Sequence, residues 1–174
     1  MGTEVEIRFR VNLHEMRKKI EALGAEFKGE EIQEDLYFSI SPRRLLRVRR
    51  IVNLNEVILG YKDIRDEKNE EFDEIEVKVE DFEKIRDILK RLGFKEDVWV
   101  KKHRYIYKLG DVTFELNHVE GLGDFLDIEV ISDNAEKAKK RIWEIARQLG
   151  LRKEEVEQRL YHEMLKALRW PQFL

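Results

Sequence analysis

The sequence of 174 residues contains no cysteine, which excludes disulfide bonds, thiolate metal sites and cysteine nucleophiles. It has only two prolines and no Gly-, Pro- or Ser-rich linker, so we expect one domain over residues 1–174. No apolar run approaches the roughly 20 residues of a membrane-spanning helix, and the N-terminus carries no apolar signal segment. These absences predict a cytoplasmic protein without a membrane partner.

A large net charge of one sign is also missing. The chain has 34 basic and 37 acidic residues, a formal net charge of −3. No nucleic-acid partner is therefore expected. What the chain has in quantity is charge of both signs, 41% of its residues, beside 42% hydrophobic residues. This composition is typical of a folded domain with a sizeable core, and such Lys and Glu richness favours a thermophilic source.

One strand-like pattern occurs three times along the chain. Residues 4–8 read Glu-Val-Glu-Ile-Arg, residues 74–78 read Glu-Ile-Glu-Val-Lys, and residues 127–130 read Asp-Ile-Glu-Val. Each copy runs into a helical segment that ends in Leu-Gly. Alternate residues of a strand point to the same side, so both acids of a copy share one face and its Val and Ile residues share the other.

The hydrophobic periodicity predicts about eight strands, mostly joined as hairpins, and three or four amphipathic helices. We expect helices after Asn12, over residues 81–92, after Asp133 as N-cap, and over about 153–169. The predicted fold class is α+β, in which the helices cover the apolar faces of the strands. Eight strands with such helices can close into a barrel whose lumen is the charged face.

The face opposite the apolar one carries acids and bases grouped on separate strands. The acids are Glu4, Glu6, Glu74, Glu76, Asp127 and Glu129, and the bases are Arg8, Arg47, Arg49, Lys62, Lys102 and Arg104. For any single strand, this face can equally be the solvated side of an ordinary antiparallel sheet. For the whole set that reading is weaker, because a solvated face usually includes more uncharged polar side chains, and grouped buried charges need partners or a ligand.

Such a face has a specific chemistry. Carboxylates from two strands supply the hard oxygen ligands that suit Mg²⁺ or Mn²⁺. Arg and Lys from other strands supply the donors that suit phosphate oxygens. A site that holds both a dication and several cationic side chains calls for a polyanion, and a nucleoside or inorganic triphosphate is the natural candidate.

These residues resemble the CYTH or triphosphate tunnel metalloenzyme superfamily, which contains class IV adenylyl cyclases, thiamine triphosphatases and inorganic triphosphatases. The family's ExExK motif is similar to residues 4–8, with Arg8 in the Lys place. Further segments that resemble family motifs are residues 35–38, 46–49, 61–62, 102–104, 116–129 and 159–165. The resemblance implies a closed eight-stranded antiparallel barrel with outer helices and a hydrophilic tunnel that binds triphosphate.

The resemblance also implies roles for individual residues. Metal ligands would be Glu4, Glu6, Asp127 and Glu129, triphosphate ligands Arg8, Arg47, Arg49, Lys62, Lys102 and Arg104, and the catalytic set Glu6, Glu129 and Arg8. Glu74, Glu76 and Asn117 are assigned supporting roles. Three departures from the family pattern matter: Asn117 stands where Asp is frequent, Asp127 is shorter than the usual Glu, and Arg8 cannot transfer a proton.

The activity that the resemblance implies is that of a class IV adenylyl cyclase, which converts ATP into cyclic AMP and pyrophosphate with Mg²⁺ or Mn²⁺. Two alternatives remain open. One is hydrolysis of thiamine triphosphate, tripolyphosphate or a nucleoside triphosphate, and the other is a non-catalytic module that binds polyphosphate or nucleotides. The four histidines are interpreted as structural. The last helix, with Tyr161 and Trp170, makes a homodimer plausible.

Overall fold

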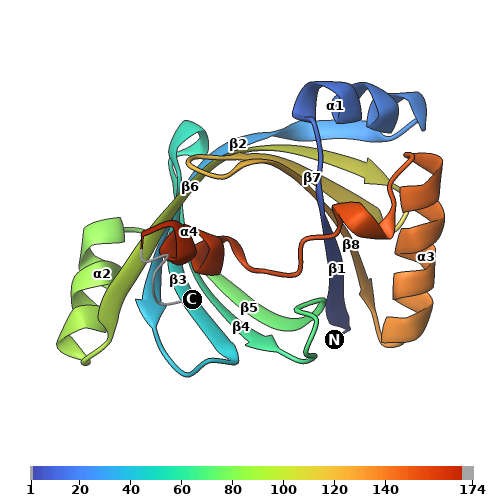
Figure 1. Ribbon diagram of the computed structural model, residues 1–174. Coiled ribbons are helices and arrows are strands. Elements are labelled where there is room, and N and C mark those ends of the chain that lie inside the picture. The colour runs from blue at the N-terminus through green and yellow to red at the C-terminus, as the bar shows by residue number, and fades with distance from the viewer. Residues whose placement is uncertain (1, 170–174) are drawn as a thin grey trace.

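The computed structural model describes residues 2–169 and shows a closed antiparallel barrel of eight strands (Figure 1). The strands are β1 (Thr3–Arg10), β2 (Glu26–Ser39), β3 (Arg44–Ile51), β4 (Glu56–Ile64), β5 (Glu71–Val79), β6 (Lys95–Leu109), β7 (Val112–Val119) and β8 (Gly123–Ser132). Their order around the barrel is β1-β5-β4-β3-β2-β6-β7-β8. The predicted α+β barrel is confirmed.

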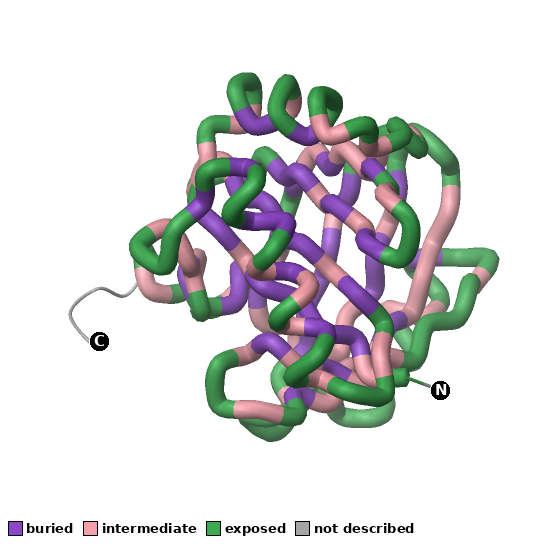
Figure 2. The backbone as a smooth tube through the Cα atoms, turned by 90° about the vertical axis from the view of Figure 1, so that its right-hand side faces the viewer, coloured by how far each residue is buried: buried purple, intermediate pink, exposed green. Residues whose placement is uncertain are grey.

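Within residues 2–169, four α-helices surround the barrel (Figure 1). They are α1 (Leu13–Ala22), α2 (Phe82–Arg91), α3 (Ala135–Gln148) and α4 (Tyr161–Arg169), the last of which lies at one end of the barrel, and two 3₁₀ turns span Val52–Leu54 and Lys153–Glu155. The largest apolar cluster joins β1, β7 and β8 to α1 and α3, with Ile7, Ile128 and Ile142 fully buried. Figure 2 shows buried and less buried residues mixed along the strands. Burial alternates over most of β7, whereas β1 has four buried residues in succession, Glu4–Ile7, because both of its faces are enclosed there.

The helices do not cover every apolar face, contrary to the expectation from sequence. On β5 the outward side chains of Ile75 and Val77 remain 64% and 53% exposed. None of the helices in the described part of the chain is long and apolar enough to cross a membrane.

The N-cap of α3 differs from the prediction by one residue. Asn134, rather than Asp133, is the cap, and its side chain accepts a hydrogen bond from the backbone N–H of Lys137. The reason is local: the backbone N–H of Asn134 donates to Ser132 Oγ at 3.0 Å, and this turn places Asn134 directly before the first helical residue.

The predicted helix over about 153–169 is wrong in its first half. Lys153–Glu155 forms a single 3₁₀ turn and α4 begins only at Tyr161. Between them the chain adds to the sheet: Val156 bridges Phe9, and the backbone N–H of Glu157 donates to the carbonyl of Arg8 at 2.8 Å. In the described chain β1 pairs with β5 at Glu4 and Val5 alone, so its later backbone groups are open to this segment, and satisfying them outweighs helix propensity.

We call residues 151–160 the strap. In Figure 1 it runs from the end of α3 across the front of the barrel to α4. Tyr161, which follows the strap, is only 5% exposed, so it cannot contribute a dimer surface as the sequence suggested. Trp170, the other residue of that suggestion, lies outside the described residues. A homodimer therefore stays a prediction.

Candidate active site

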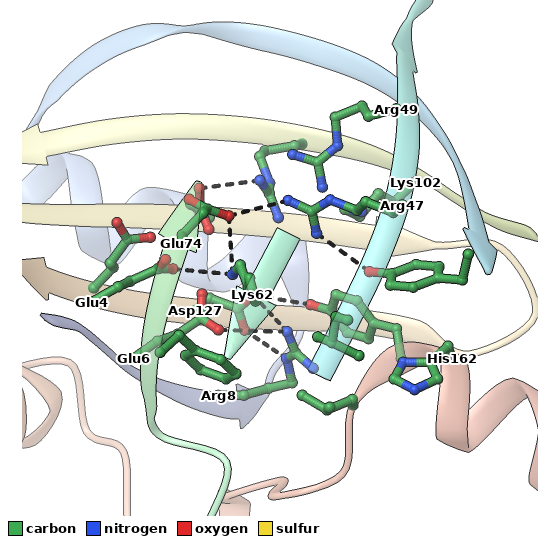
Figure 3. A pocket seen from close by; sticks show the side chains of 18 of the residues that line it. Glu4, Glu6, Arg8, Arg47, Arg49, Lys62, Glu74, Lys102, Asp127 and His162 are labelled. Carbon is green, nitrogen blue, oxygen red and sulfur yellow. Dashed lines mark hydrogen bonds and ion pairs between the residues drawn. The ribbon is translucent and has the colours of Figure 1, made fainter. Parts of the chain in front are cut away.

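The inward faces of all eight strands line one cavity of about 180 Å³ (Figure 3). Strand alternation creates it: on β1, Val5, Ile7 and Phe9 pack outward under the helices, and the residues between them point inward. The cavity brings together almost all the residues that the sequence indicated, namely Glu4, Glu6, Arg8, Arg47, Arg49, Lys62, Glu74, Glu76, Lys102, Arg104, Asp127 and Glu129. Asn117, the remaining one, is fully buried behind this lining.

One wall of the cavity, formed by β1, β7 and β8, is acidic. β1 and β8 pair Glu6 with Glu129 directly across the ladder. Carboxylate oxygens of Glu4, Glu6 and Glu129 lie within 4.8 Å of one another, and the same holds for Glu6, Glu115 and Asp127. Glu115 was not assigned a site role from the sequence, although alternation places it on the same face as Asn117.

This crowding disfavours ionisation. Burial, with Asp127 and Glu4 close by, raises the pKa of Glu6 to about 8. Burial together with the carboxylates of Glu115, Glu4 and Glu6 raises the pKa of Glu129 to about 11. Burial also raises the pKa of Glu4, although Lys62 opposes the shift. A cluster of hard oxygen donors that repel one another fits a divalent cation such as Mg²⁺ or Mn²⁺, whose charge would let them ionise together.

Asp127 is engaged differently from the three glutamates. Arg8 donates to both of its oxygens, from Nε at 2.8 Å and from Nη2 at 3.0 Å. The guanidinium of Arg8 also lies 3.5 Å from the centre of the Tyr161 ring, and Nη1 donates to the carbonyl of Arg159. Arg8 is therefore a cation of fixed orientation, held by a bidentate carboxylate and a cation–π contact.

Asn117 and Tyr161 support this arrangement from behind. Asn117 Nδ2 donates to the hydroxyl of Tyr161 at 3.0 Å and to Asp127 Oδ2 at 3.3 Å, and Asn117 Oδ1 accepts from Arg104 Nε at 2.8 Å. An aspartate in this place would add a further buried carboxylate beside Asp127. Asn117 thus connects the acidic wall to Arg104 without adding charge.

The opposite wall, formed by β2, β3 and β6, is basic and contains one buried acid. Asp35 has no exposed surface. It accepts from Arg49 Nε at 2.7 Å, from Arg49 Nη2 at 2.9 Å and from Lys102 Nζ at 2.6 Å. Sequence reasoning noted the segment around Asp35 but gave this residue no role, although it lies on the same face of β2 as Tyr37.

The middle copy of the acidic strand pattern connects the two walls. Lys62 Nζ lies 3.3 Å from Glu4 Oε1 and 3.5 Å from Glu74 Oε2. Arg47 Nη2 lies 3.5 Å from Glu74 and 3.6 Å from Glu76, and its Nη1 donates to the hydroxyl of Tyr37. Glu74 and Glu76 are therefore partners of these two cations.

The strap and α4 border one end of the cavity. There the rings of Tyr37 and His162 stack with centroids 5.0 Å apart, beside Leu45 and Leu160. These four residues also line a second hollow of about 500 Å³ that adjoins the cavity. Burial lowers the pKa of His162 to about 4, so the ring is a neutral stacking partner at neutral pH.

Sequence reasoning missed Tyr37, Tyr161 and His162 as cavity residues. Strand alternation indicates Tyr37, but no such signal exists for the other two, because they belong to a helix whose placement over the barrel is a tertiary property. The remaining histidines lie elsewhere: His14, His103 and His118 border a groove on the outer surface.

Comparison with known proteins identifies relatives over almost the whole chain. The CYTH domain family model matches residues 2–161. A Methanocaldococcus jannaschii protein named "Putative adenylate cyclase" is 34% identical over 171 residues, which cover 92% of this chain and 98% of that protein. The adenylate cyclase CyaB of Aeromonas hydrophila is 26% identical and covers 92% of this chain and 87% of that protein. The solved structure of the PH1012 protein from Pyrococcus horikoshii is 55% identical, with a TM-score of 0.91 over 92% of this chain and 98% of that one.

Proposed function

The chain belongs to the CYTH domain family, and we propose that it is a metal-dependent enzyme acting on a triphosphate inside its barrel. The observation that carries the proposal is the division of one small cavity into two walls. Crowded carboxylates on β1, β7 and β8 face oriented cations on β3, β4 and β6. A dication on the first wall and a chain of phosphates on the second would each neutralise the charge that the other introduces.

The residues divide into metal ligands and phosphate ligands. Glu4, Glu6 and Glu129 would hold Mg²⁺ or Mn²⁺, with Asp127 and Glu115 next to them. When bound, the ion would act as a Lewis acid that lowers the pKa of an attacking hydroxyl or water and neutralises phosphate oxygens. The phosphate ligands would be Arg8, Arg47, Arg49, Lys62, Lys102 and Arg104. Because a guanidinium stays protonated, Arg8 would orient phosphate and stabilise charge without moving a proton.

We propose adenylyl cyclase activity of the class IV type as the first candidate reaction. The ribose 3′-oxygen of ATP would bond to the α-phosphorus, the bond from that phosphorus to the β-phosphate oxygen would break, and pyrophosphate would leave. The adenylate cyclase names of two relatives support this choice. So does the hollow beside Tyr37 and His162, because a nucleoside there would have an aromatic surface to stack on while its phosphates enter the cavity.

Triphosphate hydrolysis is the second candidate, and a different observation favours it. The cavity itself is small, and charged side chains make up most of its lining. Such a space suits phosphates and a metal ion, and tripolyphosphate would need nothing further. Water would then attack the terminal phosphorus of tripolyphosphate, thiamine triphosphate or a nucleoside triphosphate, the bond from that phosphorus to the bridging oxygen would break, and orthophosphate and the diphosphate would leave. A purely binding module is less well supported, because it has little use for carboxylates crowded beside its cations.

Product analysis separates these readings. The protein would be incubated with ATP, tripolyphosphate or thiamine triphosphate, each with Mg²⁺, with Mn²⁺ or with a chelator. Cyclic AMP and pyrophosphate that form from ATP only when Mg²⁺ or Mn²⁺ is present support the first candidate. Orthophosphate together with the corresponding diphosphate, and no cyclic AMP, overturns the first and supports the second. Binding without turnover of any substrate overturns both. Glu129→Gln should be inactive in whichever reaction the wild type catalyses. Glu120→Gln, the same change at an exposed turn, should retain wild-type activity.

A further inference from the structure

The two cations that are least accessible from the cavity share one anion. The side chains of Arg49 and Lys102 are 7% and 1% exposed, and both contact the carboxylate of Asp35, which is fully buried. We propose that Asp35 is a positioning residue, which holds the Arg49 guanidinium and the Lys102 ammonium side by side so that both meet the phosphate chain charged and correctly oriented. The inference rests on the proposed function, because it concerns the preparation of that phosphate site.

The geometry of the hydrogen bonds supports an orienting role. Arg49 uses Nε and Nη2 on the two oxygens of Asp35, a bidentate contact that fixes the plane of the guanidinium. The remaining nitrogen, Nη1, is the one left to bind a ligand. Lys102 gives one of its three N–H donors to Asp35, so that up to two remain. Both residues line the cavity (Figure 3).

The charges around Lys102 give Asp35 a second task. Lys102 faces Asp35 on β2, Arg47 and Arg49 on β3, Arg104 on its own strand, and the Tyr161 ring at 5.8 Å. Burial and the three guanidinium groups lower the pKa of Lys102 well below its usual range, and Asp35 is the group that opposes them. Although burial alone would raise it, the pKa of Asp35 lies well below its usual range because of Arg49 and Lys102. Asp35 therefore carries the negative charge that helps Lys102 keep its proton.

A structural ion cluster and a positioning device predict different behaviour. If Asp35 merely stabilised the barrel, its replacement would lower the melting temperature and leave tripolyphosphate affinity and its pH dependence as they are. If Asp35 prepares the phosphate site, the neutral Asp35→Asn should lose the Lys102 proton at lower pH. Phosphate affinity should then fall further as pH rises, because a neutral amine binds phosphate weakly.

The test compares Asp35→Asn with a matched control on the same strand. Glu34 points to the outer side of β2 and accepts from Arg50 Nε at 3.1 Å and Arg50 Nη2 at 2.7 Å, so Glu34→Gln removes one carboxylate from an equivalent β2–β3 pair. The Lys102 side-chain NMR signal, assigned with Lys102→Arg, is followed against pH, and tripolyphosphate affinity is measured by calorimetry with Mg²⁺ from about pH 6 to pH 9.

We expect Lys102 in Asp35→Asn to titrate at least about one pH unit below wild type, and tripolyphosphate affinity to fall at least about tenfold. Glu34→Gln should change neither. An unchanged Lys102 titration, or an equal loss of affinity in Glu34→Gln, overturns the proposal. If the wild type binds no triphosphate, the proposed function fails, whereas the Lys102 titration still decides whether Asp35 sets the charge of this wall.

A second variant covers the case that Asp35→Asn does not fold. Asp35→Glu keeps the negative charge and moves the carboxylate by one methylene group. Lys102 should then titrate close to its wild-type pH, while tripolyphosphate affinity falls several-fold because the donors are displaced. Wild-type affinity in this variant would show that the position of the carboxylate does not matter and would overturn the proposal.

Discussion

Replacement of Glu6 by Gln should stabilise the metal-free protein while it abolishes metal-dependent activity. Glu6 is 7% exposed and lies within a group of carboxylates that includes Glu4 and Glu129. In the metal-free state, burial and the neighbouring carboxylates make the folded protein keep a proton on Glu6 that the unfolded chain releases at neutral pH, and Gln retains the shape of the protonated Glu without this cost. The carboxylate cluster is thus expected to lower the free energy of unfolding of the protein as long as no divalent cation is bound.

The magnitude follows from proton linkage. The pKa of Glu6 is raised from 4.5 to about 8 in the folded protein. Below about pH 4.5 both the folded and the unfolded chain carry this proton, and the full contribution to stability is present. As the pH rises toward 8, the unfolded chain releases the proton and the folded one keeps it, so stability falls by at most about 1.4 kcal/mol per pH unit. At about pH 7 the loss is at most roughly 3 kcal/mol, and because Glu4 and Glu129 share the repulsion, we expect a gain of about 1–3 kcal/mol for Glu6→Gln.

Thermal unfolding measures this gain. In a chelator at about pH 7 the melting temperature of Glu6→Gln should exceed that of wild type by roughly 3–10 °C, and the difference should vanish near pH 4.5. Addition of Mn²⁺ should raise the melting temperature of wild type but not of the variant. The matched control is Glu76→Gln, in the same cavity but away from the acidic cluster and paired with Arg47. A variant no more stable than wild type at pH 7, or an equal gain at pH 4.5, would refute this reasoning.

Three further predictions concern the cations. Arg8→Lys should lower the free energy of unfolding by roughly 1–3 kcal/mol in denaturant titrations, because Lys cannot reproduce the bidentate contact with Asp127 or the stacking on Tyr161; unchanged stability contradicts it. Arg47→Gln should raise KM for the preferred triphosphate at least about tenfold with a smaller effect on kcat. Steady-state kinetics at two salt concentrations measure this effect, and an unaltered KM contradicts the prediction. Mg²⁺ should tighten tripolyphosphate binding, and tripolyphosphate should tighten Mg²⁺ binding by the same factor; calorimetric affinities that do not depend on the other ligand exclude this coupling.

Strand periodicity was sufficient to find most of the cavity. Alternation along β1 predicts that Glu4, Glu6 and Arg8 share a face opposite Val5 and Ile7, and the structure places them in the cavity. The same rule located the cations of β3, β4 and β6. It succeeds because a closed barrel has a single interior, so the inward-facing residues of all the strands line the same space.

Pairing partners were beyond the reach of this rule. Asp35 meets Arg49 because β2 and β3 pair them in register, and it meets Lys102 because β6 packs on the other side of β2. Both registers depend on turn geometry and, for β6, on an irregularity between Leu36 and Phe38. Sequence periodicity gives the face of a residue but not its neighbour across the ladder.

The start of α4 was mispredicted for a similar reason. The segment before Tyr161 has helical periodicity, yet Val156 and Glu157 bind β1, whose edge is open there. That edge is a property of the closed barrel and of the short β1–β5 pairing. The pairing of the strap with β1 affects the site, because it places Tyr161, the next residue after the strap, against the guanidinium of Arg8.

The pairing of charges explains why metal and phosphate should bind as one unit. Each of the six cavity cations has a carboxylate within 4.0 Å, whereas within residues 2–169 Glu129 has no cation that close and Glu6 has only Arg8 at 3.9 Å. A phosphate chain alone would have to compete with carboxylates for its cations, and it would add negative charge beside acids whose ionisation the cavity already disfavours. Glu4 belongs to both halves, since it pairs with Lys62 and lies in the cluster with Glu6 and Glu129. A dication that binds Glu4 would draw this carboxylate away from Lys62 and free the ammonium for phosphate. Metal binding would thus remove the free-energy cost of breaking the Glu4–Lys62 ion pair, which phosphate would otherwise have to meet.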